Sequence, residues 1–391
     1  MSPLTKSLAQ VCRVIAWPGV IWLFMSIWHG SRVAGRSELH AMAVAYPACL
    51  ALLLVLERAL PFRARYNDAS LDARVDAAPP FHDLVHTAAT AVAVEGTKAL
   101  CEALFRQRLG VQAWGPLGVH VNIAGPALRA PVLALQVGAA LVVAELGQYW
   151  QHRLSHTSAV LWPFHAVHHS VPRLHALNTG RFHAANQALA TAMGFPLLYL
   201  AGFSDGAIYE YTGLYTVLGL LSHCNVDMRT GPLSLIFNTP ECHRWHHSAR
   251  LNESNANYGE NIMLFDHAFG TYYRGASGDG SAGGDGDDGS VAADAAGDEV
   301  GGVAAPSAMG RARYADSAAA MPALLLRPRL VALPKSIMGQ VVVPFTRNPL
   351  REAWGTLERV ASLLAASPGP TDPYDSAYRR QAVSKNVCKR A

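Results

Sequence analysis

The stretch that decides the fold lies at the end of an apolar run, and it reads Tyr149-Trp150-Gln151-His152-Arg153-Leu154-Ser155-His156. The run before it, Pro131 to Trp150, has no charged residue except Glu145. Its length is close to the roughly 17–25 residues that cross a bilayer as a helix. His152 and His156 are four residues apart and therefore share one face of a helix. The stretch predicts a membrane helix that ends in a histidine pair.

Further stretches repeat the histidine pattern, and they read Trp162-Pro163-Phe164-His165-Ala166-Val167-His168-His169, His223 by itself, and Thr239-Pro240-Glu241-Cys242-His243-Arg244-Trp245-His246-His247. Pro163 and Pro240 suit the first turn of a helix, and Thr239 can cap the second one. Spacings of three and four then place the histidines of each stretch on one helical face. Of the 17 histidines in the chain, 11 fall between His152 and His247.

This concentration of histidines indicates metal binding. Imidazole is the commonest metal ligand among side chains, and it suits Zn, Cu, Fe and Ni, so the ligand type alone does not choose the metal. Two kinds of protein fit the pattern: an enzyme with a metal centre, or a non-enzymatic membrane protein that binds or transports metal. A transport path would place ionisable residues within the spans, whereas these histidines gather at the span ends. A zinc hydrolase is disfavoured because the HEXXH motif is absent.

The remaining apolar runs predict a multi-pass membrane protein. Val14 to Trp28 and Ala41 to Leu56 are uncharged, Asp83 to Leu104 is interrupted by charges, and Ala184–Phe203 and Ile208–Leu221 form a pair with a short turn. Arginines flank the histidine stretches, which places that face in the cytoplasm by the positive-inside rule. The six cysteines include no CxxC pair, and the net charge of +4 comes without basic runs. A disulfide scaffold, a zinc ribbon and nucleic-acid binding are therefore excluded.

Composition divides the chain into four parts. We expect an N-terminal membrane anchor region at 1–130, a catalytic domain at 131–274, and a C-terminal continuation with a polar tail at 311–391. Between the last two, residues 275–310 include 11 glycines and seven acids but no aromatic residue. Such a segment buries too little apolar surface to offset its ordering entropy, so it is predicted to be a disordered insertion.

The chain resembles the fatty acid hydroxylase/sterol desaturase superfamily of integral-membrane, histidine-rich di-iron oxygenases. The resemblance covers about 131–274, and more weakly 334–345. It rests on Glu145, Tyr149-Trp150-x-His152-Arg153-x-x-His156, Leu161-Trp162-x-Phe164-His165-x-Val167-His168-His169-Ser170, Arg181-Phe182-His183, His223-x-Asn225, Thr239-Pro240-x-x-His243-Arg244-x-His246-His247-Ser248, Asn257-Tyr258-Gly259 and Asp266-x-x-Phe269-Gly270-Thr271-Tyr272.

The resemblance implies an all-α fold, a membrane helical bundle with a cytoplasmic helical cap that holds two metal ions. It implies iron as the metal, with zinc as a substitute in purified protein. The implied ligands are His152, His156, His165, His168, His169, His223, His243, His246 and His247. Some members have one more histidine four residues after the position of His223. That position is Asp227 here, so the tenth ligand is either Asp227 or His183.

Other polar residues are expected to support the ligands, with no catalytic residue beyond the ligands themselves. Glu145 lies seven residues before His152 on the same helical face, so it either accepts a ring N–H of a ligand or is a simple charge near the helix end. Asn257 and Asp266 are expected to fix the loop under the site. Position 145 is usually Asp in the family, and the residue before Asp266 is usually Trp but is Phe265 here.

The resemblance implies O₂-dependent hydroxylation or desaturation of an unactivated C–H bond in a sterol-like or fatty-acyl lipid. The sequence predicts no nucleotide-binding turn, because its GxGxxG strings, 278–283 and 284–289, lie within the glycine-rich insertion and not between a predicted strand and a helix. Electrons must therefore come from a separate donor of cytochrome b5 or ferredoxin type with its reductase. The expected location is the bacterial inner membrane, or the endoplasmic reticulum of a eukaryote, with the site facing the cytoplasm. Neither the exact lipid nor the oligomeric state follows from the sequence.

Overall fold

The computed structural model of the chain describes residues 3–68, 80–110, 126–171, 173–248 and 251–274. Within these residues the regular elements are helical, apart from two isolated bridges, Pro61 with Val226 and Phe237 with Ile262. The prediction of an all-α fold is therefore confirmed. The predictions for 275–310 and for 311–391, including the weaker resemblance at 334–345, lie outside the described residues. The proposed domain boundaries stay predictions.

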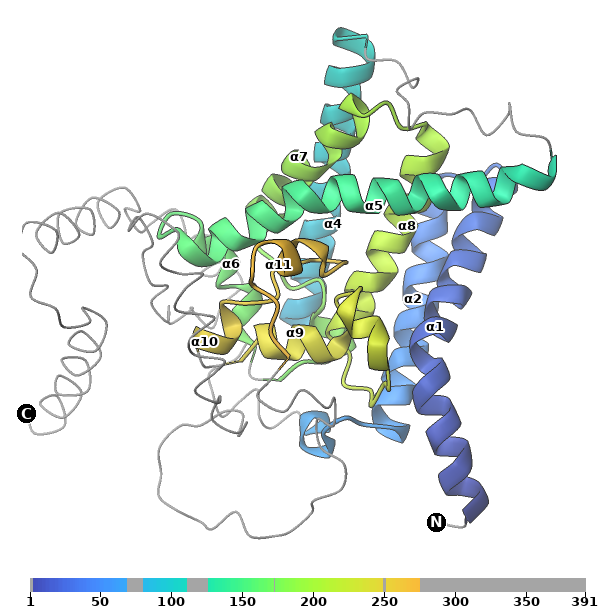
Figure 1. The fold of residues 1–391 in the computed structure, drawn as a ribbon, viewed down its shortest axis with the longest axis vertical. Helices are drawn as coiled ribbons and strands as arrows, with labels where there is room; N and C mark the ends of the chain where they lie inside the picture. The colour runs from blue at the N-terminus through green and yellow to red at the C-terminus, as the bar shows by residue number, and fades with distance from the viewer. Residues whose placement is uncertain (1–2, 69–79, 111–125, 172, 249–250, 275–391) are drawn as a thin grey trace, which may run out of the picture. The chain divides into compact units, whose positions relative to one another are not determined.

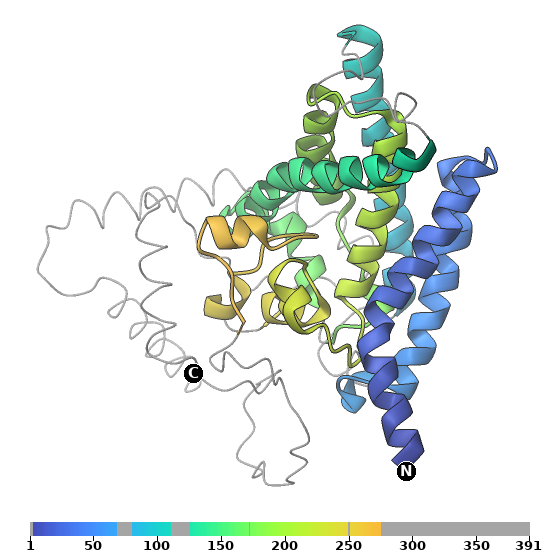
Figure 2. The ribbon, with the colours of Figure 1, turned by 45° about the vertical axis from the view of Figure 1, so that its right-hand side comes forward.

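Six long helices form the body of the described part: α1 (Pro3–Val33), α2 (Glu38–Ala59), α4 (Pro80–Glu102, extended by the π-helical turn η2, Ala103–Arg108), α5 (Pro126–Thr157), α7 (Ala184–Leu200) and α8 (Asp205–Ser222). The helices α1 and α2 run side by side, and α1 also packs on α8 (Figures 1 and 2). In both views α5 lies across α7 and α8, and α4 packs along α7.

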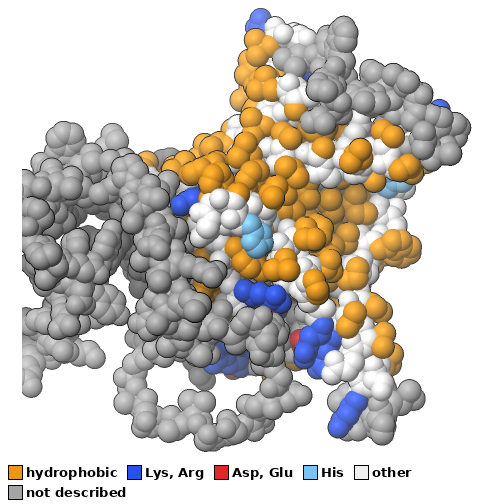
Figure 3. Space-filling model, viewed as in Figure 1, with side chains coloured by type: hydrophobic (Ala, Val, Ile, Leu, Met, Phe, Trp, Pro, Cys, Tyr) orange, Lys and Arg blue, Asp and Glu red, His pale blue; other side chains and the backbone are white. Residues whose placement is uncertain are grey.

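Three of these helices are long and apolar enough to cross a membrane: Lys6–Val33, Glu38–Ala59 and Arg129–Thr157. They correspond to α1, α2 and α5, the helices predicted from the three strongest apolar runs. The pair α7 and α8 was also expected to span, but neither helix is among the candidates; α7 has only 17 residues. Apolar side chains cover much of the face in Figure 3. The exposed aliphatic residues of α5 include Leu135, Val142 and Leu146.

Glycine allows α5 to cross α7 at close range. A Cβ atom added to Gly147 would lie 2.0 Å from the carbonyl oxygen of Met193, and one added to Gly194 would lie 3.2 Å from that of Ala144. No other residue type leaves room for this approach of two backbones. The crossing matters for function, because α5 carries the first histidine pair at its C-terminal end.

Short helices and turns connect the long helices and hold the histidines of the two HxxHH stretches. They are η1 (Ala64–Asn67), α6 (Trp162–His165), η3 (His168–Ser170), η4 (Ala176–Asn178), η5 (Gly231–Leu235), α9 (Pro240–His246), α10 (Leu251–Ser254) and α11 (Leu264–Ala268). The helix predicted after Pro163 is thus much shorter than expected, because α6 ends at His165 and a 3₁₀ turn follows. Pro240 does open α9, with Thr239 before it, although the Thr239 hydroxyl contacts Cys242 Sγ rather than capping the backbone.

Candidate metal centre

The histidine stretches meet in two groups of ring nitrogens, and within each group the potential ligand atoms lie within 4.8 Å of one another. The five-histidine group consists of His152, His156, His165, His169 and His246. The four-histidine group consists of His168, His223, His243 and His247. The two groups are adjacent, because the rings of His169 and His247 stack with their centroids 4.2 Å apart. Nine of the ten predicted histidines are thereby brought together.

Each of the two HxxHH stretches contributes histidines to both groups. His165 and His169, four residues apart, enter the five-histidine group, while His168 between them enters the other. In α9 the pair His243 and His247 enters the four-histidine group, and the histidine between them, His246, enters the five-histidine group. The earlier expectation that each stretch presents all its histidines to one side is therefore too simple.

The spacing of the ring nitrogens fits metal ions. In the four-histidine group the Nε2 atoms form a closed ring of contacts: 3.3 Å from His168 to His223, 2.8 Å from His223 to His243, 3.1 Å from His243 to His247 and 3.0 Å from His247 to His168. Nitrogens bonded at about 2.1 Å to one ion and set at right angles lie about 3.0 Å apart. In the five-histidine group, His165 Nε2 lies 3.1 Å from Nε2 of both His152 and His169.

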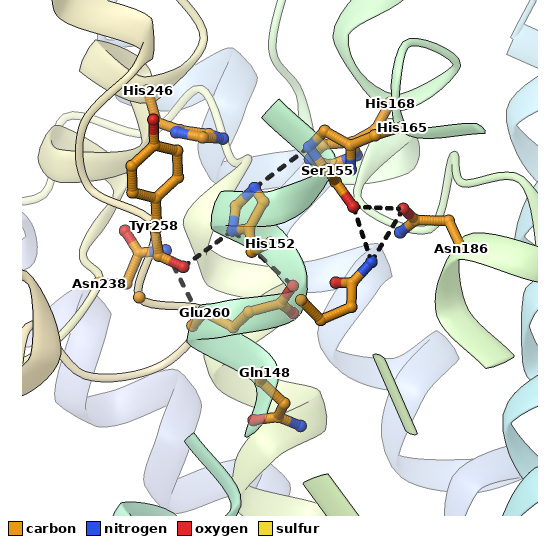
Figure 4. Close-up of polar contacts among 12 residues, drawn as sticks. Gln148, His152, Ser155, His165, His168, Asn186, Asn238, His246, Tyr258 and Glu260 are labelled. Carbon is orange, nitrogen blue, oxygen red and sulfur yellow. Dashed lines mark hydrogen bonds and ion pairs between the residues drawn. The ribbon is translucent and has the colours of Figure 1, made fainter. Parts of the chain in front are cut away.

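Hydrogen bonds at the opposite ring nitrogen leave several Nε2 atoms bare. His152 Nδ1 lies 2.8 Å from the carbonyl oxygen of Tyr258 (Figure 4), and His246 Nδ1 lies 2.8 Å from that of Ala256. A carbonyl only accepts, so both rings must donate their single Nδ1 proton. Their Nε2 lone pairs are then free for a cation, and Nε2 of His246 is buried with no hydrogen-bond partner. The residues present therefore fit bound metal.

The seven histidines of the two groups that lie outside α5 are kept neutral by burial. Burial lowers the pKa of His165 and His223 to about 3 and that of His246 to about 4. In the other four rings the pKa falls well below 6.5, mainly because of burial and further because of neighbouring imidazoles. These rings are His168, His169, His243 and His247. Near pH 7 each ring can offer a lone pair without first losing a proton.

A loop at residues 256–261 supplies the two carbonyl oxygens just described, and buried acceptors hold it. Asp266 accepts from the backbone N–H groups of Tyr258 and Gly259 at 2.8 and 2.7 Å. The close approach requires Gly259, since a Cβ there would lie 2.2 Å from the Ile262 carbonyl oxygen. Asn257, with φ of 55°, donates to the Cys242 carbonyl of α9. These contacts fit the expected role of Asn257 and Asp266. Burial raises the pKa of Asp266 to about 6.

Glu145 acts on the same loop. Its carboxylate accepts from the backbone N–H groups of Glu260 and Asn261 and from the Asn261 side chain. The contacts are therefore with the loop, in place of the predicted direct bond to a ligand ring, and Glu145 reaches His152 only through this loop. The sequence could not reveal this, because the contact spans more than 110 positions.

The two candidates for a tenth ligand lie elsewhere. His183 Nδ1 accepts from the backbone N–H of Ala185 and caps α7, so its proton sits on Nε2, the opposite tautomer to that of His152. Asp227 pairs with Arg13 at 2.8 Å and Arg229 at 3.1 Å. Neither joins a histidine group, and both ligand assignments remain untested predictions.

Sequence reasoning missed several residues around the groups. Glu260 has a carboxylate oxygen 3.9 Å from His152 Nδ1, and burial raises its pKa to about 7. Arg244 stacks on Phe62 with its guanidinium carbon 3.8 Å from the ring centroid. It also donates to the carbonyls of Cys224 and Val226 just after His223. No spacing in the sequence signals these contacts.

The comparisons with known proteins agree with this geometry. Residues 137–271 match the family model for fatty acid hydroxylase. Ornithine lipid hydroxylase OlsE of Rhizobium tropici is 37% identical over 262 residues, which cover 66% of this chain and 75% of that protein. The chain belongs to the fatty acid hydroxylase family. Both histidine groups fall inside the matched residues.

Alkylglycerol monooxygenases are more distant relatives of this family member. Those of Danio rerio and Homo sapiens are 32% and 30% identical over 130 and 129 residues, about 33% of this chain and 28% of each relative. No solved structure gives a significant match. Membership makes the chain an oxidoreductase of the lipid hydroxylase class, as predicted, and the non-enzymatic reading is set aside.

Proposed function

We propose that the chain is a multi-pass membrane enzyme that uses two iron ions and O₂ to hydroxylate a lipid of the ornithine-lipid type. The observation that carries the proposal is the meeting of nine imidazoles in two adjacent groups. The substrate class rests on the bacterial relative, whose match covers three quarters of its length. The proposed ligands are the five-histidine and four-histidine groups as defined above.

The overall reaction consumes one C–H bond, O₂, two electrons and two protons, and it yields an alcohol and water. Bound iron would supply the O₂-activating redox chemistry. The chain's own residues orient and shield that chemistry: buried imidazoles hold their Nε2 lone pairs inward, and the 256–261 loop fixes two of them. Because the sequence predicts no nucleotide-binding turn, the electrons would come from a separate redox protein of cytochrome b5 or ferredoxin type.

The proposed setting is the bacterial inner membrane with the histidine groups toward the cytoplasm. Three apolar helices support membrane insertion, and their exposed aliphatic side chains suit contact with lipid. A substrate lipid would then reach the site from the bilayer.

The experiment is to express the full chain in a host that makes ornithine lipid and to analyse the extracted lipids by mass spectrometry under isotopically labelled O₂. We expect one labelled oxygen atom in the product, whereas loss of two hydrogens would indicate desaturation. His168→Ala and His246→Ala, one from each group, should abolish the product while the protein remains in the membrane fraction. A product formed equally without O₂ would refute the proposal.

A further inference from the structure

We propose that each histidine group has its own orienting segment, and that Asn178 and Phe182 are the positioning residues of the four-histidine group. The orienting segment of that group is residues 173–183, between η3 and α7. The inference rests on the metal site of the proposed function. It means that different residues orient the ligands of the two ions, so that a substitution can weaken the binding of one ion without that of the other.

The first observation is the bond between Asn178 and His223. Asn178 Oδ1 lies 3.0 Å from His223 Nδ1, and both side chains are buried. Two backbone partners fix the orientation of the amide: its Nδ2 donates to the Arg173 carbonyl at 2.8 Å, and its Oδ1 accepts from the His175 N–H at 3.3 Å. The oxygen therefore faces His223.

This orientation determines the tautomer of His223. An amide oxygen only accepts, so Nδ1 of the neutral ring carries the proton and Nε2 is bare. That Nε2 points at the Nε2 atoms of His168 and His243, at 3.3 and 2.8 Å. Asn178 thus serves the four-histidine group as the carbonyls of Tyr258 and Ala256 serve the other.

Phe182 orients a second ring of the same group. Its ring lies flat on the imidazole of His168, with centroids 3.8 Å apart and planes inclined by only 10°. The backbone of Phe182 is held as well, because His86 of α4 donates from Nδ1 to its carbonyl oxygen at 3.0 Å. Stacking of this kind leaves the ring little freedom to rotate away from the shared ion position.

The segment is anchored to helices other than those that hold the 256–261 loop. Arg181 pairs with Asp83 of α4 at 2.8 Å, with both side chains at most 5% exposed. The backbone N–H of Ala176 donates to the buried Glu57 of α2 at 2.7 Å. The 256–261 loop is fixed instead by Asp266 of α11 and Glu145 of α5. These different anchors allow segment 173–183 to be perturbed without the loop. The reverse separation is only partial, because Asn238, which donates to the Glu260 carbonyl of the loop, also lies 3.2 Å from Nδ1 of His243.

The experiment measures metal affinity in the purified full-length protein. Metal-free protein is loaded with Co²⁺ and titrated with a chelator, while visible absorption reports the ligand field of each ion. Asn178→Leu should weaken one of the two ions by about 10- to 100-fold and leave the other unchanged, the range typical for loss of an outer hydrogen bond to a ligand histidine. Asp266→Asn should weaken the other ion.

Two matched variants separate orientation from general damage. Asn178→Asp keeps the oxygen facing His223 but loses the donor to Arg173, so it should retain nearly normal affinity for both ions. Phe182→Leu keeps an apolar side chain without a flat ring, and it should weaken the same ion as Asn178→Leu. Its result also decides the matter if Asn178→Leu fails to fold, which gel filtration and circular dichroism would reveal.

The outcomes are distinct. If the wild-type chain takes up two Co²⁺ ions but Asn178→Leu, or Phe182→Leu in its place, binds both as tightly, the inference is wrong. Equal weakening of both ions, or a loss in Asn178→Asp as large as in Asn178→Leu, would also overturn it. If the wild-type chain takes up no metal at all, it is the proposed function that fails.

Discussion

His183 and His223 show what a single hydrogen bond does to a buried imidazole. His223 donates from Nδ1 to Asn178 and turns a bare Nε2 toward two other rings. His183 accepts at Nδ1 from the Ala185 N–H, so its Nε2 holds the proton. A ring nitrogen that holds a proton offers no lone pair to a metal. Sequence spacing treats both histidines alike, whereas the partner of the second nitrogen distinguishes them.

The first prediction compares substitutions at these residues. His183→Asn should keep both metal ions, because an asparagine oxygen can replace the α7 cap. Asp227→Asn should keep both as well, since that carboxylate is paired with arginines. His223→Ala should lose one ion, because it removes a member of the four-histidine group. Metal analysis of the purified variants tests this, and loss of an ion in His183→Asn would restore His183 as a ligand.

At the scale of elements, the HxxxH and HxxHH stretches explain why one group has a fifth histidine. The pair His152 and His156 lies on one continuous helix, so both rings reach the five-histidine group. The corresponding positions 223 and 227 fall after the end of α8 at Ser222, where the chain leaves the helix in a turn at His223 and then pairs Val226 with Pro61 in an isolated bridge. Without a helical turn, Asp227 does not follow His223 into the group.

The second prediction concerns the crossing of α5 and α7. Gly147→Ala should lower the thermal stability in detergent, because the new Cβ would lie 2.0 Å from a backbone carbonyl, and overpacking of this kind costs about 1–3 kcal/mol. Gly138→Ala, on the same helix with nothing within 4 Å, is the matched control. It should be neutral or stabilise by up to about 1 kcal/mol through helix propensity.

The metal content of these two variants gives a second test of whether the crossing of α5 and α7 requires glycine. Gly147 lies five residues before His152, so a displaced α5 should move the first histidine pair and lower the metal content as well. A Gly147→Ala protein as stable and as metal-rich as Gly138→Ala would show that the crossing tolerates a side chain.

The elements also show how far sequence reasoning reaches. The apolar runs located α1, α2 and α5, and the histidine spacing pointed to eight of the nine rings that meet, all except His223, because both signals repeat locally along the chain. Glu145 and Asn178 act through partners that lie far away in the sequence or on the backbone, and no local period marks such partners. The overestimated α6 has the same origin: helical spacing fitted three histidines that in fact divide between two groups.

At the scale of the whole molecule, the cost of assembling so many buried imidazoles should appear as a pH dependence of the metal-free protein. Folding lowers the pKa of His165 and His223 from 6.5 to about 3, and that of His246 to about 4. Between these values the unfolded chain binds more protons than the folded one. The free energy of unfolding therefore falls as the pH drops below about 6.5.

Two buried carboxyl groups act in the opposite direction. Burial raises the pKa of Glu260 to about 7 and that of Asp266 to about 6, so their protonated forms favour the folded state and their contribution is lost as the pH rises through those values. They are outnumbered by the seven histidines of the two groups that lie outside α5, whose pKa values fall. The net effect on acidification should be destabilising.

The third prediction follows from this balance. Metal-free protein should melt at a lower temperature at pH 5.5 than at pH 7.5, each value chosen to lie about one unit from the free histidine pKa of roughly 6.5. Metal-loaded protein should melt higher than metal-free protein at pH 7.5, because ions that bind the folded state stabilise it. At pH 5.5 this difference should persist, because pKa values of about 3 to 4 keep the folded rings of His165, His223 and His246 neutral and able to bind metal. Scanning fluorimetry at both pH values measures all four states, and a metal-free melting temperature that does not change with pH would mean that the rings are not buried in their neutral form.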